Sequence, residues 1–331
     1  MAQTEVEVAT PDRRTGRGAV SRGRLVTALP MVMLIALVLA VSVREPTFLS
    51  GPSLSTLAES SVPIILLALG QTFVILTGGI DLSVAVLASL GTILLASWID
   101  TMGVAGILLM IACITGAGLL NGVISAYAQI PSFVVTLGAM GLWSGVALGL
   151  SGASTISIGE NYPLIGWLTG SRFAGVALGF WATMLGVVLV LVLMAFLARG
   201  KSLHTIGLAE RAALMSGIRT RRVRVLAFGA SGFFAAMAAI VLSSSQYSGS
   251  PTLADALLLP AIAAVIVGGS AITGGIGGPL RTVVGALIIG VLRVGMSILG
   301  VPPAYEQIVY GALIVVAVAL SMDRSRVRVV K

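Results

Sequence analysis

The chain has 331 residues, of which 57% are hydrophobic and 10% are charged, and its formal net charge is +8. A mean hydropathy of +1.08 excludes an ordinary soluble domain and indicates an integral membrane protein with an all-α fold. The basic excess lies beside apolar runs, as it does in membrane proteins in general. It therefore gives no reason to expect nucleic acid as a partner.

About ten apolar runs approach the roughly 20 residues that a membrane-spanning helix needs. The connections between them are too short for a separate soluble domain, so residues 25–322 are predicted to form one polytopic domain. The 41 glycines suit helices that pack closely through small residues. The predicted spans are 25–43, 56–77, 84–99, 104–127, 132–150, 174–198, 225–245, 257–272, 282–299 and 305–322.

The basic residues predict the orientation of these spans. They concentrate in residues 1–24, in the long loop 199–224 and in residues 323–331, whereas Arg44 and Arg172 fall on the other side of the predicted spans. The positive-inside rule then places both termini in the cytoplasm. Residues 1–24 are predicted as a disordered basic tail and residues 323–331 as a second basic tail.

A polar break separates the second and third predicted spans. Gly78 and Gly79 precede Asp81 there, between two long apolar runs. A charged side chain in hydrocarbon costs on the order of 3 kcal/mol, and membranes tolerate non-helical backbone only where protein or water satisfies it. Two interpretations stay open. The break belongs to a transport path, or it is a short cytoplasmic turn in which Asp81 caps the next helix.

Ser83, Asn121 and Thr136 accompany Asp81 as candidates for a translocation path or gate. Asn121 and Thr136 are polar residues in otherwise apolar spans, where polar atoms without partners are penalised. Such side chains either line a path for solute or hydrogen-bond helices together, which contributes roughly 0.6 kcal/mol per bond. The sequence leaves both roles open.

Signals for catalysis or cofactor binding fail on inspection. Gly200-Lys201-Ser202 resembles the end of a phosphate-binding loop, but Ala195 stands where such a loop requires glycine. The chain has a single cysteine and a single histidine, Cys113 and His204, so neither a thiolate cluster nor a histidine pair is available for a metal. The sequence predicts no catalytic centre, no ATP site and no cofactor bound by this chain.

The loop 199–224 contains a segment with the composition of a short helix. Residues 212–215 are helix formers, and Gly207 and Gly217 are expected to mark the start and the stop. Such a helix would lie on the membrane or dock into a groove of another protein. A solvated charge run that faces anionic lipids is the alternative. The apolar side of the helix would comprise Ile206, Leu208, Ala212, Met215 and Ile218.

Four segments share their motifs and order with one family of membrane proteins. They are 70–83, with GQT and GGIDLS; 118–138, with GLLNG and IPSFVVTLG; 206–218; and 261–290, with VGGS and GGIGG. Each segment alone is weak, because glycine-rich apolar stretches are common in membranes. Together they resemble the permease subunits of ribose-type ATP-binding-cassette sugar importers, over nearly the whole chain beyond its N-terminal tail.

The resemblance implies a multi-pass transporter subunit of the bacterial inner membrane, not an enzyme. Such a permease moves a monosaccharide or a similar small polar solute by alternating access. The implied partners are a second permease chain in a homodimer, a cytoplasmic ATPase that binds ATP and Mg, an extracytoplasmic solute-binding protein and membrane lipids. The binding protein largely selects the sugar, so the permease pattern fits a pentose, a hexose or a polyol equally well.

The resemblance also assigns ATPase coupling to the segment 206–218. This segment departs from the family pattern, because Leu208 and Ala209 stand where a second glycine and an asparagine are usual, and Leu214 replaces an arginine. We therefore expect a docking surface that is more apolar than usual. The coupling residues expected from the resemblance are Gly207, Glu210, Arg211, Ala212, Ala213, Ser216 and Gly217.

Two further charged residues lie inside predicted spans, Glu59 and Arg293. Intramembrane charges usually face the bundle interior and pair, which makes these two conceivable partners. The other interpretation of Arg293 is a side chain that snorkels from a ragged helix end. An ion-coupled secondary transporter that uses Asp81 or Glu59 remains the alternative function, and it would need no ATPase.

Overall fold

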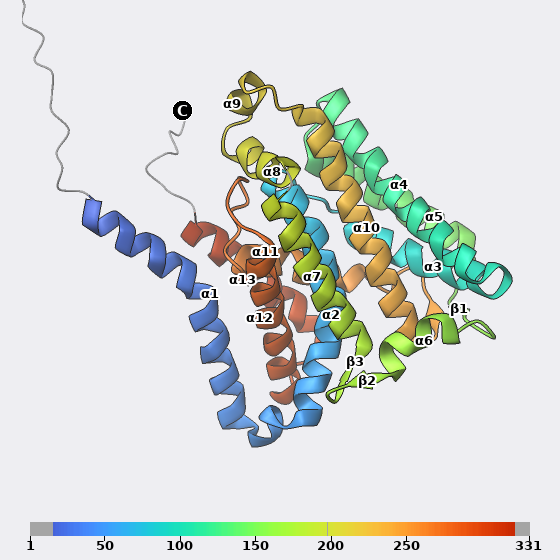
Figure 1. Cartoon of the computed structure of the whole chain (residues 1–331). Coiled ribbons are helices and arrows are strands. Elements are labelled where there is room, and N and C mark those ends of the chain that lie inside the picture. Colours follow the sequence, from blue (N-terminus) through green and yellow to red (C-terminus); the bar gives the residue numbers. More distant parts are fainter. Residues whose placement is uncertain (1–15, 197, 322–331) are drawn as a thin grey trace, which may run out of the picture.

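The computed structural model describes residues 16–196 and 198–321, and this part of the chain is mostly helical (Figure 1). Its helices are α1 (Gly16–Arg44), α2 (Gly51–Leu76), α3 (Val84–Met102), α4 (Val104–Ala128), α5 (Ser132–Ser151), α6 (Pro163–Gly170), α7 (Leu178–Phe196), α8 (Ala198–Leu208), α9 (Glu210–Met215), α10 (Thr220–Gln246), α11 (Leu258–Val267), α12 (Pro279–Ile298) and α13 (Glu306–Ser321). Short 3-10 helices are η2 (Pro46–Leu49), η3 (Asp255–Leu257) and η4 (Pro303–Tyr305).

Seven of these helices are long and apolar enough to cross a membrane: α2, α3, α4, α5, α7, α10 and α12. Three shorter apolar helices, over Ala28–Arg44, Asp255–Val267 and Pro303–Ala319, accompany them. Every predicted span overlaps one of these elements. The helical membrane architecture expected from the apolar runs is therefore confirmed at this level.

The helix boundaries differ from the predicted ones where the chain leaves helical geometry. The predicted span 257–272 is an α-helix only over Leu258–Val267, because a glycine-rich break follows from Gly268. The predicted span 174–198 begins later, at Leu178, because a β-hairpin precedes it.

The N-terminal boundary differs as well. Helix α1 begins at Gly16 and so enters the stretch 1–24 that was predicted as a disordered tail. Helical hydrogen bonds propagate readily from an apolar span into its polar flank once the helix is nucleated. Residues 1–15 of the predicted tail, and the predicted C-terminal tail 323–331, lie outside the described residues.

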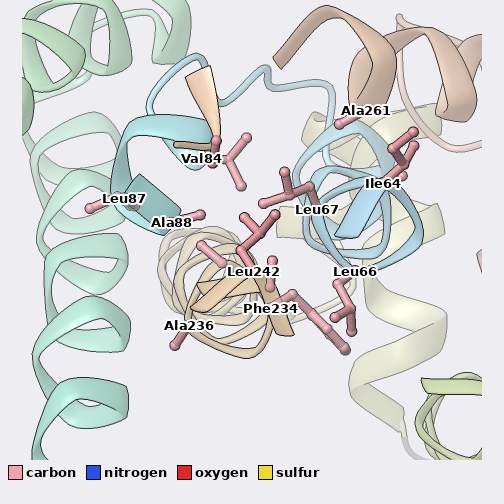
Figure 2. Close-up of a cluster of buried hydrophobic side chains, with 14 of the residues drawn as sticks. Ile64, Leu66, Leu67, Val84, Leu87, Ala88, Phe234, Ala236, Leu242 and Ala261 are labelled. Carbon is pink, nitrogen blue, oxygen red and sulfur yellow. The ribbon is translucent and has the colours of Figure 1, made fainter. Parts of the chain in front are cut away.

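Helices α2, α3 and α10 form the centre of the described molecule. Figure 2 shows side chains of this core, among them Leu67 from α2, Ala88 from α3, and Phe234 and Leu242 from α10. In lipid, such helices associate through close van der Waals packing, because the lipid tails are as apolar as the side chains. The break after α2 and the first turn of α3 are therefore surrounded by protein.

The two ends of the molecule carry different elements. Helices α8 and α9 lie at one end, whereas α6 and the β2–β3 hairpin lie at the other (Figure 1). Strand β2 (Arg172–Phe173) pairs with β3 (Val176–Ala177) antiparallel, with Arg172 opposite Ala177. Strand β1 (Ile156–Ser157) pairs with β4 (Ser248–Gly249) in the same sense.

Candidate functional site

The break after α2 is a tight, non-helical turn. The backbone amide of Gly78 donates to the carbonyl of Ile75 at 2.8 Å, and that of Gly79 donates to the carbonyl of Val74 at 3.1 Å. Gly78 has φ of +79°, a left-handed conformation that glycine adopts without a Cβ penalty. The glycine pair therefore ends α2 and directs the chain toward Asp81.

Asp81 is fully buried, and its carboxylate is bound on both oxygens. Oδ1 accepts from the backbone amide of Ser83 at 2.9 Å and from the Ser83 hydroxyl at 2.6 Å. Oδ2 accepts from the hydroxyl of Ser231 on α10 at 2.7 Å. Through these three hydrogen bonds, the side chain of Asp81 fastens the first turn of α3 to α10.

Gln71 of α2 holds the backbone of the same residue. Its Nε2 donates to the Asp81 carbonyl at 2.6 Å, and its Oε1 accepts from the Asp81 amide at 3.2 Å. This pair of bonds satisfies the backbone groups that the broken helix leaves open, as an environment without water requires.

Two of the predicted polar residues connect further helices to the break. Asn121 of α4 donates from Nδ2 to the Ser83 hydroxyl at 2.9 Å. The hydroxyl of Thr136 on α5 accepts from the Leu82 amide at 3.0 Å, and the hydroxyl of Ser132 accepts from the Ile80 amide at 3.0 Å. Five helices therefore meet at one polar cluster. We call it the Asp81 network: Gln71, Asp81, Ser83, Asn121, Ser132, Thr136 and Ser231.

The structure thus brings together all four predicted path or gate residues. Asp81, Ser83 and Thr136 have no exposed surface, and Asn121 is 2% exposed, so in this conformation they hydrogen-bond helices together. The sequence prediction did not include Gln71, Ser132 or Ser231 in the cluster. Gln71 could have been recognised from the sequence, because it places an amide side chain inside an apolar helix.

A second break, residues 268–278, touches the first. The Gly275 amide donates to the carbonyl of Leu76, the last residue of α2, at 3.0 Å. A Cβ on Gly274 would lie 2.7 Å from the backbone nitrogen of Gly78, and one on Gly207 of α8 would overlap the backbone of Gly275 and Leu76. Three chain segments therefore meet backbone to backbone. We call Gly78, Gly207, Gly274 and Gly275 the glycine junction.

His204 adds a side-chain contact to this junction. Its Nδ1 lies 3.1 Å from the carbonyl oxygen of Gly275. Because a carbonyl only accepts, Nδ1 carries the proton in this hydrogen bond. The bond ties α8 to the glycine-rich break, one turn before Gly207.

The predicted coupling helix is in fact two helices. Gly207 was expected to start it, but Gly207 lies inside α8, because its role is the close backbone contact in the junction. Ala209 then interrupts the helix, with φ of −160° and ψ of 90°, and α9 begins at Glu210. Gly217 follows the end of α9 with φ of +78°, so the predicted stop is confirmed.

Helix α9 exposes apolar side chains at the end of the molecule. Met215 is 92% exposed and Leu214 is 53% exposed, while Ala213 is buried against the protein. Leu208, at the end of α8, is 66% exposed, whereas Ile206 is buried. The predicted apolar side is therefore divided: part of it packs inward, and part of it points outward on α8 and α9.

Glu210 positions α9 on the protein. Its Oε2 accepts a 2.7 Å hydrogen bond from Nη2 of Arg224 on α10. Both side chains are partly exposed, so this ion pair contributes little to stability and mainly orients the short helix.

The conceivable pair of Glu59 and Arg293 is wrong. Glu59 Oε1 lies 2.9 Å from Nη1 of Arg172, because the β2–β3 hairpin folds onto α2. Arg293 Nε lies 3.5 Å from Oε2 of Glu306, at the start of α13. Each charge has a partner, but not the one that the span positions suggested.

Comparisons with known proteins agree with this architecture. The model of a family described as "Branched-chain amino acid transport system / permease component" matches residues 53–318. The chain is 36% identical over 303 residues to the ribose import permease protein RbsC of Bacillus subtilis (strain 168), covering 89% of this chain and 92% of that protein.

Two further relatives have similar extents. Identity is 31% over 310 residues to the ribose import permease protein RbsC of Escherichia coli (strain K12), covering 92% of this chain and 96% of that protein. Identity is 32% over 314 residues to the autoinducer 2 import system permease protein LsrC of Escherichia coli O9:H4 (strain HS), covering 93% and 89%. No solved structure matches the chain.

Proposed function

Since this chain belongs to the family of branched-chain amino acid transport system permease components, we propose that it translocates a monosaccharide or a similar small polar solute by alternating access. The chain aligns with import permeases over about nine-tenths of its own length and of theirs. This similarity is the observation that carries the proposal. The chain is a multi-pass subunit of the bacterial cell membrane. Permeases of this family have no ATPase activity, so ATP and Mg belong to a partner.

The family implies an ATP-binding-cassette ATPase and a solute-binding protein as partners. The proposed orientation, with both termini in the cytoplasm, rests on the basic residues of loop 199–224 and of the terminal segments. A single polytopic domain over 25–322, and its pairing as a homodimer in the lipid bilayer, complete the proposed arrangement. In this orientation α8 and α9 face the ATPase.

The exposed apolar side chains of α9 support a role in coupling. Leu214 and Met215 are exposed on α9, and the Glu210–Arg224 ion pair holds this helix against α10. The helix therefore presents exposed apolar side chains in a fixed position. A helix that inserts its apolar residues into a groove is a common mode of recognition. The proposed coupling residues are Gly207, Glu210, Arg211, Ala212, Ala213, Ser216 and Gly217.

The Asp81 network is our candidate gate. Asp81, Ser83, Asn121 and Thr136 are bound to one another or to the broken backbone. A rearrangement of α3, α4 or α5 would have to exchange these bonds together, which favours two discrete states over a continuum. The ion-coupled alternative through Asp81 or Glu59 is set aside on the ground of family membership.

The coupling role is tested by capture of the ATPase. The full chain is purified in mild detergent from its own membrane, and the co-purifying ATPase is quantified by mass spectrometry. We expect the double variant Leu214→Ser, Met215→Ser to lose it, and the control Leu299→Ser, which changes an apolar side chain that is 64% exposed elsewhere, to retain it. Capture that is equal in both variants contradicts docking by α9.

The solute class is tested in vesicles that contain the captured assembly. Radiolabelled pentoses, hexoses and polyols are supplied with the cognate solute-binding protein, and ATP is placed on the side of the ATPase. ATP-dependent uptake of one of these solutes supports the proposal. Uptake that needs an ion gradient and no ATP would restore the secondary-transporter alternative.

A further inference from the structure

A cavity of about 870 Å³ lies beside α9. It is lined by α9, the first turn of α10, the turn between α4 and α5, and the beginning of the break after α2, and it is open on one side. None of Asp81, Ser83, Asn121 and Thr136 lines it, but Ser132 of the Asp81 network does, so the cavity reaches the edge of the candidate gate. Its charged lining residues are Glu210, Arg211, Arg219, Arg221, Arg222 and Arg224.

The lining of this cavity is strongly cationic. Five arginines face one carboxylate, and that carboxylate, Glu210, is engaged by Arg224 at 2.7 Å. The guanidinium carbon of Arg221 lies 5.6 Å from the ring centroid of Tyr127 on α4, a cation–π contact that holds the side chain at the cavity wall. Like charges gathered in a concave site repel one another, so a bound anion would stabilise the arrangement.

Apolar side chains are exposed directly beside these cations. Tyr127, Ile130 and Phe133 line the cavity and are 52%, 39% and 53% exposed, respectively. Tyr127 and Phe133 belong to the ends of α4 and α5, which are among the helices long enough to span the membrane, and Ile130 lies in the turn between them. The site thus combines cationic groups with an adjoining apolar surface. This combination is complementary to an anionic amphiphile at a membrane surface.

We propose that this arginine cavity binds a phosphate-bearing anion, and that the anion is the headgroup of an anionic phospholipid whose acyl chains lie along Ile130 and Phe133. Arginine suits the ligand because its planar guanidinium binds phosphate oxygens in a bidentate manner. Since α9 forms one wall of the cavity, the bound headgroup would brace the segment that we propose for ATPase docking. The site itself does not depend on that proposal.

The test measures lipid binding to the full chain, purified with the subunits that accompany it. After delipidation, native mass spectrometry counts the bound molecules on adding phosphatidylglycerol or phosphatidylcholine with the same acyl chains. We expect a clear preference for phosphatidylglycerol. Each of Arg219→Gln, Arg221→Gln and Arg222→Gln should weaken it roughly fivefold, and the triple variant on the order of 100-fold.

Lys201→Gln is the matched control, because Lys201 is an exposed cation of α8 that does not line the cavity. Equal losses in Lys201→Gln and in the arginine variants overturn the proposal, since they indicate general surface charge. The single variants keep the test decisive if the triple variant does not assemble.

Competition with inorganic phosphate distinguishes a phospholipid headgroup from free phosphate, since both carry the phosphate group that the arginines would bind. If phosphate fails to displace phosphatidylglycerol at millimolar concentration, the lipid assignment is supported. If phosphate alone binds with the same dependence on Arg219, Arg221 and Arg222, the anion site stands and the lipid assignment is overturned. Absence of binding by both phosphatidylglycerol and phosphate overturns the proposal as a whole.

Discussion

Two helix breaks touch each other in this molecule. One is stabilised mainly by side-chain hydrogen bonds, and the other mainly by backbone contacts. The break at 77–83 is held by side chains, because the Asp81 carboxylate accepts three hydrogen bonds and Gln71 binds the backbone. The break at 268–278 makes its contacts with α8 and with the first break mainly through backbone atoms, at Gly274 and Gly275. The first break requires particular polar side chains, whereas the second requires that Gly274 and Gly275 carry no side chain at all.

This difference predicts different responses to mutation. Loss of a partner in the Asp81 network leaves buried polar groups unsatisfied, and its cost depends on how many groups are orphaned. An added side chain in the glycine junction meets main chain that has little freedom to move aside. The first kind of damage is relieved by a side chain that restores a hydrogen bond, and the second kind is not.

The largest effect is expected for Asp81→Ala. Three donors, the Ser83 amide, the Ser83 hydroxyl and the Ser231 hydroxyl, would lose their acceptor in a buried site. Each orphaned group costs about 1–3 kcal/mol, so we expect a large fall in the thermal unfolding midpoint and loss of uptake. Asp81→Asn, which keeps one carbonyl oxygen, should lose less.

The measurement compares the unfolding midpoints of the purified Asp81 variants in one detergent. If Asp81→Ala unfolds at the temperature of the unaltered protein, side chains do not hold the first break. Full uptake by Asp81→Asn would show that a hydrogen-bond acceptor suffices and that the gate does not depend on charge.

An intermediate effect is expected for Gly207→Ala. The added methyl group would overlap the backbone of Gly275 and of Leu76, and overpacking of this kind costs about 1–3 kcal/mol. The matched control is Gly186→Ala, in helix α7, where a Cβ would meet no atom within 4 Å. We expect Gly207→Ala to lower both the unfolding midpoint and uptake, and Gly186→Ala to change neither. Equal behaviour of the two variants would refute the close contact at the junction.

The same contrast explains which features the sequence could predict. Apolar runs located every membrane-length helix, because lipid imposes a minimum length on a spanning segment. Asp81 and Asn121 stood out as polar residues among apolar ones. Ser231 did not, because a serine in a small-residue helix is equally compatible with plain packing and with a hydrogen bond to a carboxylate.

Contacts between distant segments escaped prediction for a related reason. Gly207 was taken for a helix start because glycine often marks helix ends, whereas its contact with Gly274 and Gly275 depends on how the helices pack. The pairing of Glu59 with Arg172 likewise requires the β2–β3 hairpin to fold onto α2. Local composition contains no information on either approach.

The smallest effect on stability, and the sharpest test of the comparison, is expected for His204. Its hydrogen bond to the Gly275 carbonyl is a side-chain contact within a junction otherwise made by backbone. His204→Leu should lower stability by only about 1 kcal/mol, the usual net contribution of such a bond. His204→Asn places an amide donor near the position of Nδ1 and should preserve this hydrogen bond.

If α8 transmits the action of the ATPase through this junction, His204→Leu should reduce the solute transported per ATP hydrolysed, while His204→Asn should not. An unchanged ratio in His204→Leu would mean that the backbone contacts of the glycine junction alone connect α8 to the two breaks.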